Sequence, residues 1–393
     1  MEALYAGIDW GGQAHQVCLI AADGRRVREL RVGHDVAGLA ALDEALGAAG
    51  SVAIAIERAE GLLVEHLLEA GHVVYPVNPR IAARIRERYR VAPTKDDSFD
   101  AFTLADGLRH EQARWRPIRL YSPLLGELRA LVRDRERIVD QHVRAAQQLR
   151  AILETYHPAA ARLFSSPSRQ VALQFVRDYP TPERAARLGE RRMQRFLERC
   201  SYTGRVPAAE LVERLRANLM HASPGTTTGR AFSALHYVEL VAQLVTIREA
   251  YDDQIALLLA RHADAVIFRS FPGVGPVTAA SLLAEIGEDR DRFPNAEALL
   301  AEAGLAPVTR RSGQTRRVRF RYAANHHLRQ SFTWMAYNSL EESDWARNAY
   351  RDARQRGQRS YRALRGLGSR WARIVYRCWQ DRTTYDASRH HTS

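Results

Sequence analysis

The sequence predicts an α/β, ribonuclease H-like N-terminal domain, an α-helical coiled-coil middle and a mainly α-helical C-terminal domain with a helix-hairpin-helix-like element. Three observations support this prediction. Apolar runs near the N-terminus follow the order β-β-β-α-β-α-β-α, which is the order of a ribonuclease H-like fold. Two long runs in the middle have apolar residues at helical spacing, and the C-terminal third is rich in arginine. The corresponding domain boundaries are 1–115, 116–265 and 266–393.

The N-terminal domain begins with a predicted meander of three strands. The first strand is expected at 4–9 and the second at 15–22, and the Asp23-Gly24 turn leads into the third at 25–32. Helices and strands then alternate: helices are expected at 36–50, 61–71 and 78–90, and strands at 51–57 and 72–77. A further helix is expected from about residue 96.

The middle of the chain is predicted to contain two long amphipathic helices. The segment 121–165 differs in composition from the N-terminal domain, and apolar residues recur at helical spacing over 122–156 within it and again over 230–264, with few helix breakers. Such helices form either an antiparallel pair or a dimerising coiled coil. The stretch 166–229 contains the segments PSRQ, PTPE and SPGTTTG and predicts shorter helices and loops.

The positive charge of the chain is concentrated near its C-terminus. The net charge is +13, and 17 arginines against four acidic residues between 308 and 380 account for all of it. Clustered arginine indicates a polyanionic partner, because the guanidinium group forms bidentate contacts with phosphate. We therefore expect nucleic-acid binding, with Arg370 and Lys95, the only lysine, among the contacts.

The remaining composition argues against several other classes of protein. Cys18, Cys200 and Cys378 are far apart and odd in number, which fits neither a disulfide framework nor a zinc site. The N-terminal residues lack the long apolar run of a signal peptide. No stretch of about 18 uncharged apolar residues predicts a membrane span. We expect a cytoplasmic protein with no membrane partner.

Four carboxylates are predicted to meet at one edge of the sheet. Asp9 ends the first strand and Glu57 ends the fourth, and these strands are neighbours in a ribonuclease H-like sheet. Asp97 and Asp100 are three residues apart, which puts both on one face of a later helix. Such a cluster repels itself unless it binds a divalent cation, and oxygen ligands favour Mg²⁺ or Mn²⁺.

Each of these acids has an alternative explanation when it is taken alone. A single aspartate after a strand is more often a turn or cap residue. Asp96 competes with Asp97, and Glu60 competes with Glu57, although Glu57 directly follows an apolar run. Only the joint pattern predicts a metal site.

A glycine-rich turn precedes a predicted helix in the C-terminal domain. Gly273 and Gly275 form a Gly-x-Gly turn, and its backbone amides can hold a phosphate without reading sequence. This arrangement is similar to helix-hairpin-helix modules that bind DNA backbones. A plain helix N-terminus is the alternative.

One serine is flanked by two pairs of arginines. Ser312 follows Arg310 and Arg311 and precedes Arg316 and Arg317. A nucleophilic serine needs positive charge to stabilise its alkoxide and the phosphate that it attacks, and arginines or a metal supply that charge. An ordinary loop serine is the alternative.

These motifs, in this order, resemble the transposases of the IS110 insertion-sequence family in its broad sense, over nearly the whole chain. The matching segments include GIDWGGQAH, YPVNP, TKDDSFDAFTLA, FPGVGPVTAA, FPNAEALLAEAGLAP, RRSG, NHHLRQ and RGQRSYRALRGLGSRWARIVY. Asp96 departs from the pattern, since the family more often has threonine there. The three-residue step to Asp100 favours Asp97 as the ligand.

The resemblance implies a RuvC-like domain with a DEDD set, a coiled coil, and a C-terminal transposase domain with a nucleophilic serine. The residues that match are Asp9, Glu57, Asp97 and Asp100 for the acids and Ser312 for the serine. It also implies a homo-oligomer, dimer or tetramer, whose active site combines the serine of one subunit with the acids of another. A structured guide RNA would pair with donor and target DNA, and the protein would be bacterial and nucleoid-associated.

We therefore expect a DNA transposase that cleaves and rejoins strands through a phosphoserine intermediate assisted by magnesium. No G-x-x-x-x-G-K-[ST] loop is present, in keeping with a reaction that needs no nucleotide cofactor. One alternative is a metal-dependent nuclease or Holliday-junction resolvase in which water attacks. Another is a non-catalytic DNA- or RNA-binding protein.

Overall fold

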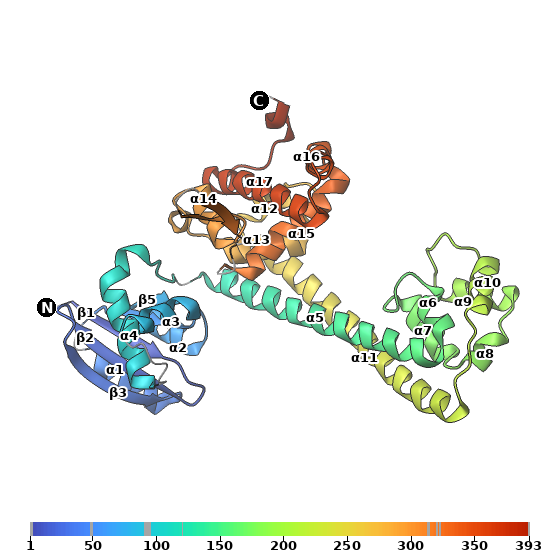
Figure 1. Ribbon diagram of the computed structural model, residues 1–393, viewed down its shortest axis with the longest axis horizontal. Coiled ribbons are helices and arrows are strands. Elements are labelled where there is room, and N and C mark those ends of the chain that lie inside the picture. The colour runs from blue at the N-terminus through green and yellow to red at the C-terminus, as the bar shows by residue number, and fades with distance from the viewer. Residues whose placement is uncertain are drawn as a thin grey trace. The chain divides into compact units, whose positions relative to one another are not determined.

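The computed structural model describes residues 3–47, 50–89, 96–119, 121–312, 315–319, 321 and 324–391, with only the backbone path for 308–312, 315–319 and 390–391. The chain divides into two compact units (Figure 1). The first contains Met1–Ser122 with Phe320–Ala324, and the second contains Pro123–Arg319 with Asn325–Ser393. The second unit thus includes both the long helices of the middle and the C-terminal helices.

The first unit is built on a mixed five-stranded sheet in the order β3-β2-β1-β4-β5. The strands are β1 (Leu4–Asp9), β2 (Ala14–Ala21), β3 (Arg26–Gly33), β4 (Ala53–Ile56) and β5 (Val73–Pro76). The first three strands pair antiparallel as a meander, and β1, β4 and β5 run parallel. The predicted mixed sheet, with its first and fourth strands as neighbours, is confirmed.

Helices cover this sheet, and α4 packs most closely. The helices are α1 (Val36–Gly47), α2 (Leu62–Glu69), α3 (Pro79–Glu87), α4 (Asp97–Glu111) and the 3-10 turn η1 (Gln112–Arg114). A Cβ atom at Gly7 of β1 would lie 2.0 Å from the carbonyl oxygen of Ala101 in α4. Only glycine lets the helix come this close, and this contact brings the start of α4 to the end of β1.

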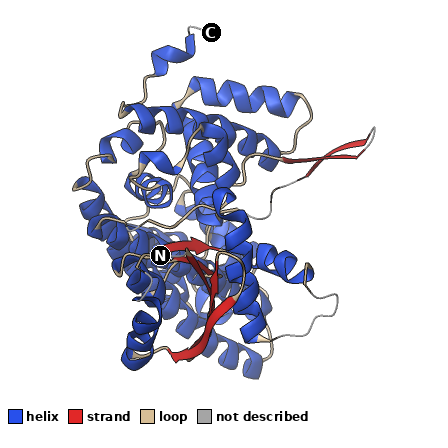
Figure 2. Ribbon diagram, turned by 90° about the vertical axis from the view of Figure 1, so that its left-hand side faces the viewer, coloured by secondary structure: helices blue, strands red, loops and turns tan. Residues whose placement is uncertain are grey.

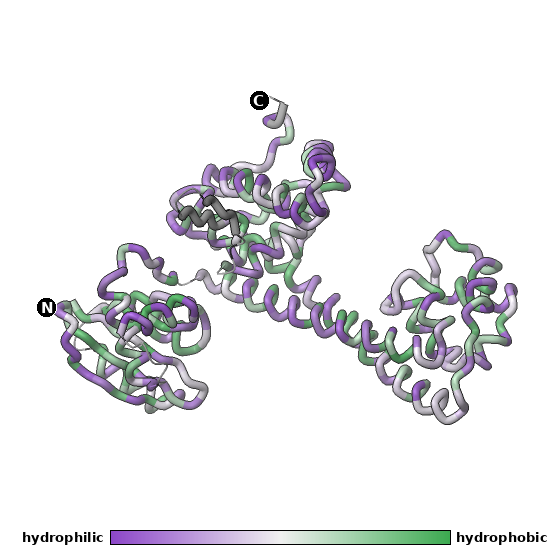
Figure 3. The backbone as a smooth tube through the Cα atoms, viewed as in Figure 1, coloured by the Kyte–Doolittle hydropathy of each residue, from purple (hydrophilic) through white to green (hydrophobic). Residues whose placement is uncertain are grey.

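Two long helices, α5 (Pro123–Tyr156) and α11 (Pro224–Ala260), pack side by side and antiparallel in the second unit (Figure 1). Hydrophobic and hydrophilic residues alternate along both (Figure 3), and Arg135 of α5 pairs with Asp252 of α11. Of the two arrangements considered from the sequence, the structure contains the pair within one chain. In the described part of the chain, no helix is long and apolar enough to cross a membrane.

One predicted helix end is confirmed and one predicted helix start needs correction. The apolar run predicted at 122–156, within the segment 121–165, forms α5, which ends at Tyr156 because Pro158 starts a new helix and disfavours helical geometry at His157. The second run was expected from residue 230, but α11 starts at Pro224, with Ser223 as its N-cap.

Five short helices between α5 and α11 form a small bundle, here called the helical tip (158–217). They are α6 (Pro158–Leu163), α7 (Gln170–Asp178), α8 (Pro182–Ala186), α9 (Glu190–Arg199) and α10 (Ala208–Ala217). Phe175, Met193 and Leu211 are among the buried residues that join them to the long helices.

The C-terminal part is helical apart from one hairpin. Its elements are α12 (Ala265–Arg269), α13 (Pro276–Ile286), η2 (Arg290–Arg292), α14 (Ala296–Glu302), β6 (Val308–Ser312), β7 (Thr315–Arg319), α15 (His326–Glu342), α16 (Asp344–Gln355), α17 (Ser360–Asp381) and η3 (Ala387–His391). The indole nitrogens of the buried Trp371 and Trp379 donate to Ser339 Oγ and to the Gly287 carbonyl. Figure 2 shows β6 and β7 as a two-stranded extension of this helical part.

Candidate functional site

Asp9 and Glu57 leave neighbouring parallel strands at the same end of the sheet. Ile8 of β1 is in register with Ile56 of β4, Asp9 is the last residue of β1, and Glu57 directly follows β4. Both carboxylates are half-buried. The sheet therefore brings together two acids that are far apart in the sequence, as their positions at strand ends predicted.

Asp100 joins this edge through Arg86. The Asp100 side chain, in the first turns of α4, is almost fully buried. Arg86 of α3 donates from Nη1 to Asp100 Oδ2 at 3.1 Å and to Glu57 Oε1 at 3.4 Å. Two of the four predicted acids thus meet at a single cation, which is a guanidinium group.

The start of α4 separates the roles of Asp96 and Asp97. Asp96 is the N-cap, and its Oδ1 accepts hydrogen bonds from the Ser98 amide at 3.1 Å and the Ser98 hydroxyl at 2.9 Å. Asp97 is the first helical residue and is exposed to solvent. Capping occupies the Asp96 carboxylate, whereas Asp97 lies one turn before Asp100 on the same helix face.

The donor set at this edge fits a hard divalent cation. Carboxylate oxygens are the ligands that Mg²⁺ and Mn²⁺ prefer, and Glu57 and Asp100 already reach one positive group. Within the described ranges, however, no three His, Cys, Asp or Glu side chains stand close enough together to hold a metal ion. In this arrangement Arg86 supplies the positive charge between two of the acids.

Two residues that sequence reasoning missed lie beside this edge. Arg58 stacks over the ring of Trp10, with its guanidinium carbon 3.9 Å from the ring centroid. Both residues, with His34 and the exposed Glu60, line a small cavity of about 90 Å³. Only their position in the sequence could have indicated them, because Trp10 directly follows Asp9 and Arg58 directly follows Glu57.

Ser312 lies at the end of β6 in an arginine-bearing hairpin. The antiparallel register places Ser312 opposite Thr315, Arg311 opposite Arg316 and Arg310 opposite Arg317. The register therefore pairs two arginine positions of one strand with two arginine positions of the other. The side chains of these residues, and all of Lys95, lie outside the described residues.

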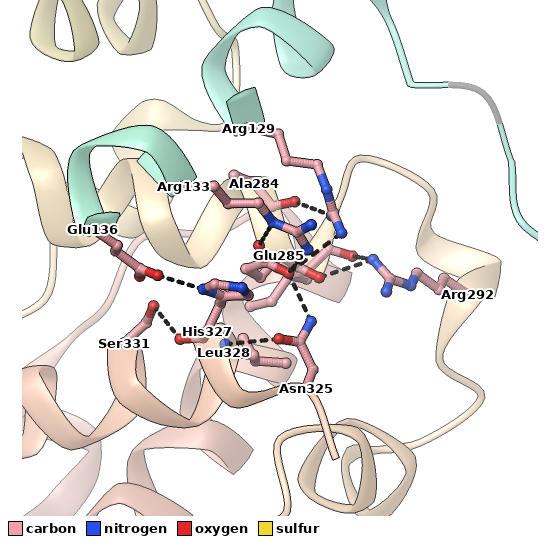
Figure 4. A network of polar contacts seen from close by, with 11 residues as sticks. Arg129, Arg133, Glu136, Ala284, Glu285, Arg292, Asn325, His327, Leu328 and Ser331 are labelled. Atoms are coloured by element: carbon pink, nitrogen blue, oxygen red, sulfur yellow. Dashed lines mark hydrogen bonds and ion pairs between the residues drawn. The ribbon is translucent and has the colours of Figure 1, made fainter. Parts of the chain in front are cut away.

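A buried ionic network holds Asn325, which immediately precedes α15, against α13 (Figure 4). Glu285 of α13 is 0% exposed and accepts from Arg133 Nε at 2.9 Å and from Asn325 Nδ2 at 2.6 Å. Burial by itself would raise the pKa of Glu285, but the charges of Arg129 and Arg133 and these hydrogen bonds bring it to about 2. Asn325 is also the N-cap of α15, so the network joins α5, α13 and α15.

The Gly273 turn has a structural role that the sequence did not reveal. Gly273 has φ +69°, and a Cβ there would lie 2.6 Å from the backbone of Asn338. Its amide donates to Glu342 Oε2 at 2.7 Å, so a carboxylate occupies the place proposed for a phosphate. Gly275 is the N-cap of α13, and Arg370 is exposed on α17.

Comparison with known proteins gives matches along nearly the whole chain. Residues 6–158 match the DEDD transposase family model, and residues 265–351 match the model described as transposase IS116/IS110/IS902 family. The chain is 34% identical to a mini-circle putative transposase for IS117 of Streptomyces coelicolor, over 98% of this chain and 96% of that protein. It is 33% identical to a putative transposase of Sinorhizobium fredii over 50% of this chain and 56% of that protein. It is 28% identical to an uncharacterized 42 kDa protein of insertion element IS900 of Mycobacterium paratuberculosis, over 98% and 97% of the two chains.

Proposed function

Because the chain belongs to the IS110 family of transposases, enzymes that cleave and rejoin DNA, we propose that it exchanges DNA strands through a covalent phosphoserine intermediate. The observation that supports this proposal best is the hairpin register, in which Ser312 ends two facing rows of arginines. Positive charge in that position would stabilise both the serine alkoxide and the phosphate that it attacks.

In the proposed reaction the Ser312 hydroxyl attacks a DNA phosphorus. A bond forms between the serine oxygen and phosphorus, and the bond from phosphorus to the 3′ oxygen breaks. The serine proton leaves to solvent, and the departing oxygen takes up a proton to become a 3′-hydroxyl. Attack of a 3′-hydroxyl on the phosphoserine reverses these steps and joins new strands. The covalent link conserves the phosphodiester bond energy, so rejoining needs no nucleotide cofactor.

The acidic edge would assist this exchange. A magnesium or manganese ion held by Asp9, Glu57, Asp97 and Asp100 would neutralise charge on the phosphate and the leaving oxygen. Arg86 keeps Glu57 and Asp100 close together by balancing their charge. Its side chain must give up at least one of these contacts when a second cation enters.

The arginine-rich region would supply affinity for nucleic acid rather than sequence specificity. Contacts of arginine with phosphate release counterions, so binding should weaken steeply as salt rises. Replacement of the exposed Arg370 by alanine should lower the salt slope by roughly one unit, to a similar extent on unrelated sequences. We propose that a structured guide RNA reads donor and target DNA by base pairing.

We further propose that the active protein is an oligomer, so that the serine of one subunit meets the acids of another. Phe232 and Leu240 of α11 are 66% and 44% exposed and lie two helical turns apart on one face. Large apolar side chains in such a row suit an interface between subunits.

The covalent adduct separates this reaction from its main alternative. In a nuclease that uses water, cleaved DNA carries no protein, whereas strand exchange leaves a denaturation-resistant protein–DNA link. The protein, with the RNA that copurifies with it, is incubated with magnesium and with DNA from the element labelled at its 3′ ends, because the serine would stay linked to the fragment that carries the 3′ end, and the products are then run on a denaturing gel. Label that migrates with the protein supports strand exchange. Cleavage that depends on metal and gives no labelled protein supports the nuclease.

A further inference from the structure

The helical tip contains a cavity of about 290 Å³. It lies between the two segments that match transposase models, 6–158 and 265–351, so neither match gives it a role. The side chains that matter for its chemistry are two aromatic residues and four arginines, namely Phe164, Tyr202, Arg162, Arg169, Arg205 and Arg214.

The walls of this cavity are strongly positive. No acidic residue lines it, and all four arginines are exposed. Across the whole helical tip, 12 arginines stand against six acidic residues. The cavity therefore attracts an anion rather than a neutral ligand.

Three of the four guanidinium groups have no carboxylate partner among the described residues. Arg162 contacts Asn218 Oδ1 and Arg169 contacts the Ser165 hydroxyl, each at 3.4 Å, which is long for a hydrogen bond. The Arg205 side chain makes no hydrogen bond or ion pair within the described part of the chain. Only Arg214 is paired, with Glu210. Most of the donors are thus available to a phosphate.

An aromatic ring completes the cavity. Tyr202 is half-buried and packs edge-to-face on Phe164 at 5.9 Å between ring centroids. A Cβ at Gly204 would lie 2.1 Å from the Tyr202 ring, so glycine there lets the ring stand against the cavity wall. Aromatic rings of this kind stack with unpaired bases in single-stranded nucleic acids.

We infer that the helical tip binds one unpaired nucleotide of a nucleic-acid strand, with its phosphate held by Arg162, Arg169 and Arg205 and its base against Tyr202. The cavity volume is at the lower end of the roughly 300–1,000 Å³ found for small-molecule sites, which suits a single nucleotide and excludes a duplex. This inference rests on the proposed function in one respect, namely that the anion bound in the cavity is a nucleic acid.

Photochemical crosslinking of the full chain tests this site directly. The probes are a short oligouridine that contains 4-thiouridine and a short oligothymidine that contains 4-thiothymidine, and crosslinked peptides are identified by mass spectrometry. We expect a crosslink on the peptide that contains Tyr202. The probe that gives it tells whether the strand is RNA or DNA.

Two double variants of equal charge make the test specific. Arg169→Ala/Arg205→Ala removes two guanidinium groups from the cavity, whereas Arg191→Ala/Arg195→Ala removes two exposed arginines of α9 that do not line it. The first should abolish the Tyr202 crosslink and leave crosslinks in 308–380 intact, and the second should change neither. Thermal melting checks that both variants fold.

Two results would overturn the inference: no Tyr202 crosslink with either probe, or a Tyr202 crosslink of equal yield in both double variants. Neither depends on the serine chemistry, because crosslinking requires binding alone. A protein that forms the covalent DNA adduct but lacks the Tyr202 crosslink refutes the tip site only. A protein with the crosslink and no adduct refutes the proposed reaction only.

Discussion

Glu57 and Asp100 accept hydrogen bonds from the same nitrogen atom, Nη1 of Arg86, at 3.4 and 3.1 Å. One acid follows a strand and the other lies in a helix, so only the tertiary fold brings them together. Their shared guanidinium balances the repulsion that two neighbouring carboxylates would otherwise feel. In the proposed metal-bound state, Arg86 and the divalent cation would compete for the same two carboxylates.

Replacement of Arg86 by glutamine should make the protein depend more strongly on divalent metal. Without metal, loss of the two charged hydrogen bonds should lower the free energy of unfolding by about 1–3 kcal/mol. With Mg²⁺ or Mn²⁺, the melting temperature should rise more than it does in the unchanged protein, because binding to the native state adds stability. Arg84→Gln, at an exposed position of the same helix, is the matched control. A metal-induced shift no larger than that of the unchanged protein would refute the competition.

Removal of Glu285 should destabilise the second unit strongly. Glu285→Ala leaves Arg129 and Arg133 without their buried partner, and loss of one member of such a pair costs about 3–5 kcal/mol. Glu297→Ala breaks the exposed pair with Arg373 and should change stability by less than about 1 kcal/mol. Urea unfolding measures both, and equal effects would show that the Glu285 network does not anchor the fold.

The same network predicts how stability depends on acid pH. The pKa of Glu285 falls from the ordinary 4.5 to about 2 in the folded chain. Because the folded value is depressed, its stabilising contribution is complete above the unfolded pKa and is lost as pH falls through the folded pKa. The difference in urea midpoint between the unchanged protein and Glu285→Gln should therefore shrink from about pH 4.5 toward pH 2. A difference that stays constant over this range would contradict the assignment.

The sheet and its strand-end acids could be predicted because they depend on local patterns. Alternating apolar runs fix which residues end a strand, and the order of elements makes β1 and β4 neighbours. Asp9 and Glu57 follow from that order. Arg86 could not be predicted in this way, since nothing within α3 indicates which carboxylates a long side chain will reach across the fold.

Helix ends show a second limit of local reasoning. The segment SPGTTTG has the composition of a loop, yet Ser223 caps α11 and Pro224 fits its first turn. The same residue types that end one helix can begin another. The role of Glu285 could not be predicted from the sequence either, because its partners come from α5 and from the N-cap of α15 and meet it only in the folded chain.

Charge on the exposed row of α11 should weaken self-association. Phe232→Glu/Leu240→Glu places two carboxylates where an apolar interface is proposed, and the molar mass measured by light scattering should fall toward that of one chain. Val36→Glu, at an exposed apolar position in the first unit, should leave the mass unchanged. An unchanged mass in the α11 variant, or a strict monomer for the original protein under all conditions, would contradict the proposed interface.

The proposed strand exchange depends most on Ser312, and identification of the residue that becomes attached to DNA tests it directly. Adduct formed with element DNA, copurified RNA and magnesium is trimmed with nuclease, digested with protease, and sequenced by mass spectrometry. We predict a nucleotide or phosphate on Ser312 and no adduct in Ser312→Ala, which should still bind nucleic acid as tightly as the unchanged protein. Attachment to a different residue, or a wild-type level of adduct in Ser312→Ala, would contradict the proposed role of Ser312.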